Sequence, residues 1–362
     1  MPIDSRTARA PLEHLLDARP PDTLAASLAP EDRATPAHPT GGTRITPEAT
    51  GPRRWWIYQR ERFPLLLHAP LIGAFTSSAV CLSALLRGAA APGAAGGPGW
   101  STFVAAFGTG LTFFLQLRIA DEFKDFEDDA RYRPYRPVPR GLVALRELGV
   151  VGAVCAAAQL ALALWVDPRL VALLAVVWAY MVGMSVEFGV RDWLRRHALT
   201  LLWTHMLVLP LFDLYATAYD WMPAGAHVAS GIGWFLGASF CNGIVVEVGR
   251  KLRAPADEEH GVDTYSALYG RPRAAAGLLA MMALTWACAV GVGRQSGHVL
   301  LAAAPLGLLL LATAAWSVAF LRDPRPGRGR AFELLSGVWT LVLYLATGIV
   351  PFVAARLGAG AR

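Results

Sequence analysis

The sequence predicts an all-α protein, a polytopic membrane helix bundle with about nine transmembrane helices. Three observations lead to this prediction. Hydrophobic residues make up 54% of the chain and charged residues 17%, a low charged share for a soluble protein of this length. Apolar stretches long enough to cross a bilayer recur along the sequence. Basic residues gather in alternate connecting segments, as they do in proteins that cross a membrane several times.

The apolar stretches give the order of the expected helices. Several of them contain Gly or Pro, so their ends are defined only to within a few residues. Residues 53–362 then form one transmembrane domain. The nine expected spans are 64–86, 101–120, 143–165, 168–186, 197–216, 228–248, 273–292, 297–320 and 332–355.

Residues 1–52 have a different composition. They are rich in Pro, Ala, Thr and Asp and show no apolar periodicity, so we expect a disordered N-terminal tail. No apolar core follows the first charges, which excludes a secretory signal peptide.

Basic residues predict the orientation of the bundle. With the N-terminus in the cytoplasm, the outer loops hold little more than Arg87, Arg169 and Arg294. This positive-inside asymmetry predicts a multi-pass protein of a cell inner membrane with a cytoplasmic N-terminus. It also explains the net charge of +6, and no basic soluble module for nucleic acid is expected. The inner segments carry Arg53, Arg54, Arg60 and Arg62; the cluster at 131–146; Arg191, Arg195 and Arg196; Arg250, Lys251, Arg253, Arg271 and Arg273; and Arg322, Arg325, Arg328 and Arg330.

An acidic segment follows the second span. In Asp121-Glu122-Phe123-Lys124-Asp125-Phe126-Glu127-Asp128-Asp129, aspartates recur every four residues at 121, 125 and 129. Each step of four drifts about 40° around a helix, so the three carboxylates would share one face if the helix continues. Like charges on one face repel unless a cation joins them, and carboxylate oxygens suit Mg²⁺.

A second acidic site lies at the inner end of the sixth span. Glu247 ends an apolar helix, where a carboxylate is costly unless it meets a cavity, a cation or a partner. Arg250 and Lys251 follow it, and Asp257 comes soon after. Two acidic patches at the same membrane boundary, interleaved with basic residues, suggest Mg²⁺ ions that hold an anionic ligand such as diphosphate.

These segments resemble the signatures of the UbiA-type membrane prenyltransferases over about residues 60–356. Asp121-Glu122-x-x-Asp125-x-x-x-Asp129 resembles their Asn-Asp-x-x-Asp-x-x-x-Asp motif, and Arg136-Pro-Val-Pro-Arg-Gly141 resembles the run that follows it. Asp257-Glu-Glu-His-Gly261-Val-Asp-Thr264 and Gly270 resemble part of the second signature. Nine helices with signatures after the second and sixth also match that family.

Three positions depart from the family pattern. Asp121 stands where the family usually has Asn, and Glu247 stands where the second motif has its first Asp. Lys251 occupies the position of the second Asp, which Asp257 would replace through an insertion. These departures bear on the substrate class more than on the metal and diphosphate chemistry.

The resemblance implies a mechanism. Asp121, Asp125, Asp129 and Glu247, with Asp257, would bind Mg²⁺ and thereby hold a prenyl diphosphate and neutralise its leaving group. Arg191 lies near the place of a family Lys that contacts diphosphate, and Lys124, Arg250 and Lys251 would also bind it. An acceptor, typically an aromatic ring carbon, would then attack the allylic cation in a cavity that excludes water.

Other functions stay open from the sequence. A terpene cyclase on the same scaffold would use the same metals, with an internal double bond in place of the acceptor. A transporter would place its acidic residues near the bilayer midplane rather than at one surface. A lipid-binding scaffold with an inactive site is the remaining alternative. The chain has no Gly-rich phosphate loop ending in Lys-Ser/Thr, no nucleophile elbow and no His-Glu-x-x-His motif.

Overall fold

A computed structural model describes residues 51–89, 97–259 and 261–359 of the chain. All regular elements in these ranges are helical, which confirms the predicted fold class. The tail predicted at residues 1–52 lies outside the described residues except for its last two, and Pro52 already begins the first helix.

Among the described residues, eight helical segments are long and apolar enough to cross a membrane. The expected span at 168–186 corresponds to α6 (Leu170–Ser185), which is apolar but only 16 residues long. The eight are α2 (Leu65–Leu86), α3 (Trp100–Lys124), α5 (Leu145–Val166), α8 with α9 (Ala198–Met206 and Val208–Trp221), α10 (Ile232–Arg250), α12 (Arg271–Ser296), α13 (Val299–Arg322), and α14, η5 and α15 together (Arg330–Tyr344, Leu345–Ile349 and Val350–Ala359). The short helices are α1 (Pro52–Arg62), α4 (Phe126–Tyr132), η3 (Glu187–Gly189), α7 (Arg191–Arg196), η4 (Pro255–Asp257) and α11 (Tyr265–Tyr269).

Two of the spans are irregular. The span Ala198–Trp221 breaks at Leu207, between α8 and α9. Pro210 follows in the first turn of α9, and because proline has no N–H it removes the backbone bond to Met206. The last span contains a π-helical segment, η5, between α14 and α15.

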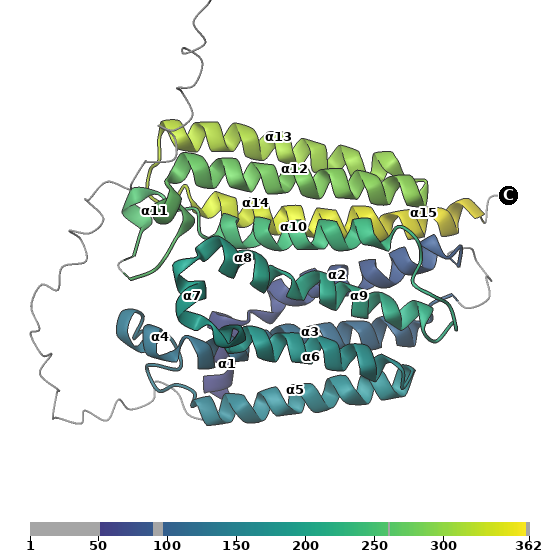
Figure 1. Ribbon diagram of the computed structural model, residues 1–362, viewed down its shortest axis with the longest axis horizontal. Coiled ribbons are helices and arrows are strands. Elements are labelled where there is room, and N and C mark those ends of the chain that lie inside the picture. Colours follow the sequence, from purple (N-terminus) through teal and green to yellow (C-terminus); the bar gives the residue numbers. More distant parts are fainter. Residues whose placement is uncertain (1–50, 90–96, 260, 360–362) are drawn as a thin grey trace, which may run out of the picture. The chain divides into compact units, whose positions relative to one another are not determined.

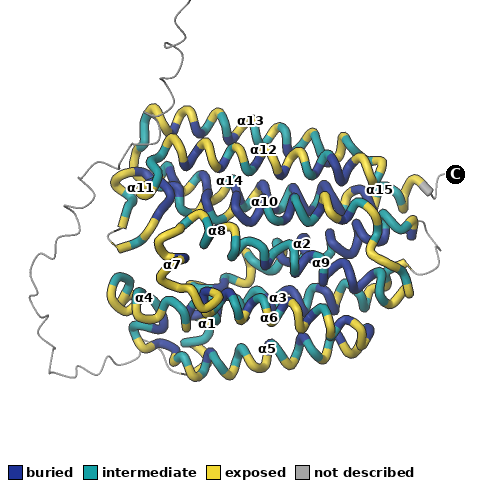
Figure 2. The backbone as a smooth tube through the Cα atoms, viewed as in Figure 1, coloured by how far each residue is buried: buried dark blue, intermediate teal, exposed yellow. Residues whose placement is uncertain are grey.

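The long helices lie side by side with roughly parallel axes (Figure 1). One core joins α2, α3, α6 and α9, and its aromatic centre includes Phe113 stacked on Phe212 with ring centroids 4.3 Å apart. A second core joins α10, α12, α13 and α14 around the buried Trp339. The outer helices α5 and α13 leave large apolar side chains such as Val154 and Leu308 exposed (Figure 2). A lipid environment accounts for that exposure, because such an apolar surface would be unfavourable in water.

Buried polar groups tie helices of the bundle together. The Tyr344 hydroxyl donates to Asp213 Oδ2 at 3.2 Å and lies 3.3 Å from Ser239 Oγ. Thr340 Oγ1 donates to Asn242 Oδ1 at 3.0 Å. These contacts link α9, α10 and α14 in the interior, where polar side chains commonly pair across membrane helices.

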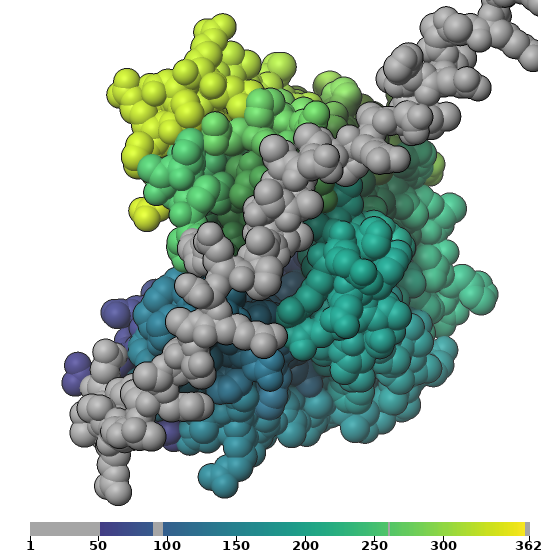
Figure 3. Space-filling view, turned by 60° about the vertical axis from the view of Figure 1, so that its left-hand side comes forward, coloured from purple at the N-terminus to yellow at the C-terminus, as the bar shows by residue number. Residues whose placement is uncertain are grey.

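One end of the bundle collects the charged segments that the sequence singled out. We call it the motif end, formed by residues 121–144, 186–197, 247–259, 261–273 and 322–330. It lies at the left of Figure 1, and Figure 3 turns that side forward. Its helix ends come from both halves of the chain, so it brings together residues that are more than a hundred positions apart.

Candidate active site

The first acidic segment lies at a break between two helices. α3 ends at Lys124 and α4 begins at Phe126, with Asp125 between them at φ −97° and ψ 7°. Helical bonding nevertheless continues across the break, because Asp125 N donates to Asp121 O at 2.9 Å and Asp129 N donates to Asp125 O at 2.8 Å. The three aspartates therefore keep their helical spacing of four residues, although they do not lie on one continuous helix.

The three aspartates have different surroundings. Asp121 pairs with Arg118 at 2.9 Å. Asp129 is 1% exposed and pairs with Arg133 at 3.1 Å and Arg136 at 2.5 Å. Arg136 opens the Arg-Pro-Val-Pro-Arg-Gly run, so this run folds back onto the last aspartate of the motif.

Asp125 is the aspartate that best fits a metal ion. Its carboxylate makes no hydrogen bond or ion pair within the part of the chain that the structure describes. Burial raises the pKa of Asp125, the charges of Asp121 and Asp129 raise it further, and those of Lys124 and Arg133 lower it. A half-buried carboxylate without a partner, between two other carboxylates, is an environment that a divalent cation would stabilise.

The second acidic segment is arranged differently. Glu247 contacts both Arg250 and Lys251, the latter at 2.9 Å, so two cations already neutralise it. Asp257 accepts a hydrogen bond from the backbone N–H of Gly327 at 2.8 Å, which ties it to the loop between α13 and α14. No group of three His, Cys, Asp or Glu side chains in the described ranges forms a ready metal centre. The individual metal ligands thus remain predictions.

The two segments nevertheless meet at the motif end. Gly261 has φ +74°, and a Cβ there would overlap the ring of Tyr132, so the loop of the second segment packs directly on α4. The Tyr135 hydroxyl donates to Glu259 Oε2 at 3.3 Å across the same boundary. The sequence could not have predicted this contact, although a glycine in a polar loop is a common sign of close approach.

The predicted diphosphate-binding residues divide between these segments. Lys124 Nζ lies 3.0 Å from Glu187 Oε1, and Arg191 Nη2 donates to the backbone oxygen of Lys124 at 3.4 Å. Arg250 and Lys251 are held on the opposite side by Glu247. Sequence reasoning missed Glu187, and the available signal was a single carboxylate at the end of an apolar span.

The match of a family profile decides the classification. The profile of the UbiA prenyltransferase family matches residues 80–337. The chain belongs to the UbiA prenyltransferase family. Membership in this family implies an enzyme with prenyltransferase chemistry and a multi-pass integral membrane protein. No curated relative matches the chain in sequence.

Two solved structures agree with this chain in fold. The apo structure of a UbiA homolog from Aeropyrum pernix K1 superposes with a TM-score of 0.59 at 17% identity, over 77% of this chain and 96% of that one. The structure of a digeranylgeranylglyceryl phosphate synthase gives a TM-score of 0.51 at 12% identity, over 83% of this chain and 99% of that one. At such identities the likeness establishes the UbiA fold.

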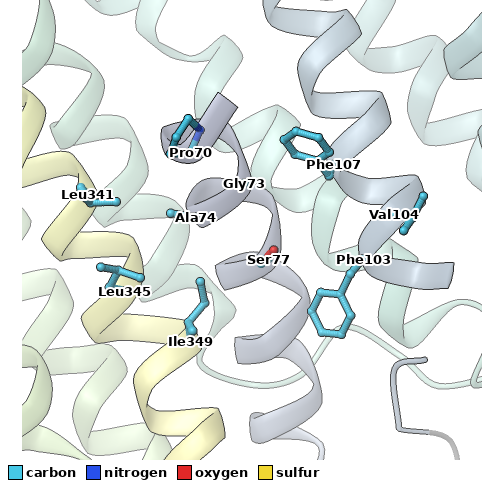
Figure 4. Close-up of a pocket in the computed structure, with 10 residues that line it drawn as sticks. All are labelled: Pro70, Gly73, Ala74, Ser77, Phe103, Val104, Phe107, Leu341, Leu345 and Ile349. Atoms are coloured by element: carbon cyan, nitrogen blue, oxygen red, sulfur yellow. The ribbon is translucent and has the colours of Figure 1, made fainter. Parts of the chain in front are cut away.

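An apolar groove, open to the surface, lies on the flank of the UbiA bundle. Its volume is about 470 Å³, and its walls come from α2, α3, α14 and η5. Figure 4 shows Phe103 and Phe107 of α3 on one side and Leu341, Leu345 and Ile349 on the other. Such walls suit a hydrocarbon chain, because they offer apolar contact and almost no hydrogen-bonding groups.

Proposed function

We propose that this chain is a Mg²⁺-dependent prenyltransferase that moves a prenyl group from a prenyl diphosphate to a lipophilic acceptor, typically an aromatic ring carbon. The contact between the two acidic segments at the motif end carries this proposal. Near this contact lie Asp125, whose carboxylate has no partner among the described residues, the basic Lys124 and the Glu247–Lys251 pair.

The residues of the motif end would divide the work. Asp121, Asp125 and Asp129, with Glu247 and Asp257, are the proposed ligands of Mg²⁺, which would neutralise the diphosphate as it leaves. Asp129 would have to exchange an arginine partner for that role, whereas Asp125 would not. Lys124, Arg191, Arg250 and Lys251 would bind the phosphate oxygens.

The reaction would proceed by ionisation and attack. The bond between the allylic carbon and the diphosphate oxygen breaks, and its electron pair leaves with diphosphate. The acceptor carbon then forms a bond to the allylic cation and loses a proton. The apolar interior of the bundle would keep water from the cation.

We also propose that the motif end faces the cytoplasm and that the N-terminus lies on the same side, in a cell inner membrane. The arginines of the inner segments support this orientation through the positive-inside rule.

Diphosphate release tests the proposal. Purified protein in detergent is given geranyl, farnesyl or geranylgeranyl diphosphate with Mg²⁺, without acceptor and with a panel of aromatic acceptors, and Asp125→Ala and Glu247→Ala are assayed beside it. We expect Mg²⁺-dependent release that falls at least about a hundredfold in both variants, because each loses charge stabilisation of the leaving group. Asp128→Asn is the matched control, since Asp128 forms an exposed pair with Arg195.

Product analysis separates the transferase from its alternative. An adduct that depends on an aromatic acceptor supports the transferase. A cyclic hydrocarbon without acceptor would instead support a UbiA-type terpene cyclase, an option raised by Lys251 at the position of a carboxylate. Absence of release from every donor by folded protein contradicts both.

A further inference from the structure

A buried charge cluster joins α3 to the turn that precedes α7. Glu187 is 4% exposed, and its two carboxylate oxygens face different side chains. Oε1 pairs with Lys124 Nζ at 3.0 Å, whereas Oε2 lies 3.3 Å from His205 Nε2 and has no hydrogen-bond partner among the described residues. Lys124 Nζ and His205 Nε2 are themselves 3.3 Å apart, so the three side chains form a closed triangle.

The backbone at this cluster is strained. Glu187 has φ 52° and Phe188 has φ 51°, in the left-handed region that residues other than glycine rarely adopt. The Phe188 ring is held by Tyr180, at a centroid distance of 5.5 Å, and by Gly183, where a Cβ would lie 3.2 Å from the ring. Strain of this kind persists only where the surroundings impose it, and it concentrates at functional sites.

The cluster orients the ammonium group of Lys124. An ammonium has three N–H donors. His205 Nδ1 lies 2.8 Å from the carbonyl oxygen of Leu201, so the ring proton belongs on Nδ1 and Nε2 accepts from Lys124. Glu187 and His205 together take two of the three donors, and the third has no partner among the described residues, which leaves it for a ligand.

The same turn leads into Arg191. Arg191 begins α7 two residues after η3, and its Nη2 donates to the backbone oxygen of Lys124 at 3.4 Å. Glu187 therefore contacts Lys124 directly and precedes Arg191 by four residues in the same turn, and both of these basic residues are proposed to bind diphosphate.

We propose that Glu187 is a positioning residue for the diphosphate of the substrate. Its carboxylate holds Lys124 in place and fixes the turn that carries Arg191, while Glu187 itself does not touch the ligand because both are anions. The inference rests on the proposed function and adds to the same site a residue that neither signature contains.

Binding of inorganic pyrophosphate tests this role. Full-length protein in detergent is titrated with pyrophosphate and Mg²⁺ by calorimetry, before and after Glu187→Gln. Positioning predicts weaker binding by about tenfold, the usual effect of removing a group that orients a ligand-binding residue. A pure charge effect predicts the opposite, since the loss of a nearby negative charge favours an anion. Tighter or unchanged binding by the variant would therefore overturn the proposal.

Two further variants keep the test decisive if Glu187→Gln folds poorly. Glu187→Gly removes the carboxylate while relieving the positive φ, so it should fold and still bind pyrophosphate about tenfold more weakly. Glu187→Asp keeps the charge and should recover part of the affinity. Normal affinity in the glycine variant, or no recovery in the aspartate variant, contradicts the inference.

The control is a buried ion pair at the other end of the bundle. Arg87 donates two hydrogen bonds to Asp220, at 2.9 and 2.7 Å, and Asp220 is buried like Glu187. Asp220→Asn should lower the melting temperature without changing pyrophosphate affinity. An equal loss of affinity in this variant would reduce Glu187 to a structural role.

The outcomes for the two proposals differ. If wild-type protein binds pyrophosphate and releases diphosphate from an allylic donor, but the Glu187 variants bind as well as wild type, only the positioning role fails. If wild-type protein does neither, the proposed function fails and the positioning role fails with it.

Discussion

Asp125 and Asp129 are only one helical turn apart, yet their carboxylates have different surroundings. Asp129 is buried and paired with two arginines, which makes it a structural anchor for the run that follows it. Asp125 is half-buried and has no such partner among the described residues. A half-buried carboxylate without a counter-charge destabilises the fold and favours a bound cation. We therefore expect Asp125 to contribute most to Mg²⁺ binding at this site.

Replacing Asp129 should cost stability. Asp129→Asn leaves Arg133 and Arg136 partly buried without their counter-charge, and we expect a loss of about 3 kcal/mol in the free energy of unfolding, seen as a lower melting temperature in detergent. Asp128→Asn removes only an exposed pair with Arg195 and should cost no more than about 1 kcal/mol. Equal melting temperatures for the two variants would show that the Asp129 pairs carry no net stability.

Asp125 predicts a dependence of stability on pH. Burial raises its pKa above the ordinary value of 3.8, so in chelator the folded protein binds this proton more tightly than the unfolded chain does. Stability should fall as pH rises from the unfolded pKa through the raised, folded one. Metal-free Asp125→Asn should thus melt at a higher temperature than wild type at pH 7, and the difference should vanish below the unfolded pKa. A thermal scan series over pH checks this, and a less stable variant at neutral pH would contradict it.

Helix irregularities mark the elements that shape the site and the core. α3 gives way to α4 at Asp125, and α8 gives way to α9 ahead of Pro210. The π-helical η5 lies against α2, where a Cβ on Gly348 would overlap the backbone and side chain of Ser78. A methyl group added at Gly348 cannot be accommodated there, since the backbone of α2 does not move aside as a flexible side chain does.

Two glycines of the last span should therefore respond in opposite ways to alanine. Gly348→Ala should lower the free energy of unfolding by about 2 kcal/mol or more, because α2 and η5 must separate. Gly337→Ala, in α14 with nothing within 4 Å of the added Cβ, should be neutral or stabilising by up to about 1 kcal/mol through helix propensity. Melting temperatures in detergent decide the point, and a tolerated Gly348→Ala would contradict the close packing.

At the scale of the whole molecule, the two ends of the bundle differ in charge. The motif end holds both acidic segments and most of the arginines of the described residues, whereas the opposite end holds the connections 166–169, 222–231 and 297–298. An asymmetric charge distribution gives a membrane protein one orientation, and here it would put the proposed diphosphate site on the side where a charged, water-soluble head group is available.

Cysteine labelling tests that orientation. A membrane-impermeant maleimide should label Pro326→Cys only after the membrane is opened, and Ala224→Cys in intact cells, because these exposed positions lie at opposite ends of the bundle. The wild-type cysteines give little background, since Cys81, Cys155 and Cys241 are buried and Cys288 is half-buried. The reverse pattern would place the motif end outside the cell.

Much of the fold follows from hydropathy and charge. All expected spans have a helical counterpart, because a membrane forces every apolar stretch of sufficient length into a helix. The helix breaks at Leu207 and Asp125 could not be predicted from the sequence, since they depend on how a chain segment packs as well as on its composition.

The sequence by itself determined the membrane bundle, its charged end and the two acidic segments, because hydropathy, charge and motif spacing are local properties of the chain. Tertiary structure alone decided that Tyr132 packs on Gly261, that Arg136 folds back on Asp129, and that Glu187 and His205 surround Lys124. The physical reason is distance along the chain. Most of these partners are dozens of residues apart, and only the packing of α3, α4, α8 and α10 against their neighbours brings them within contact.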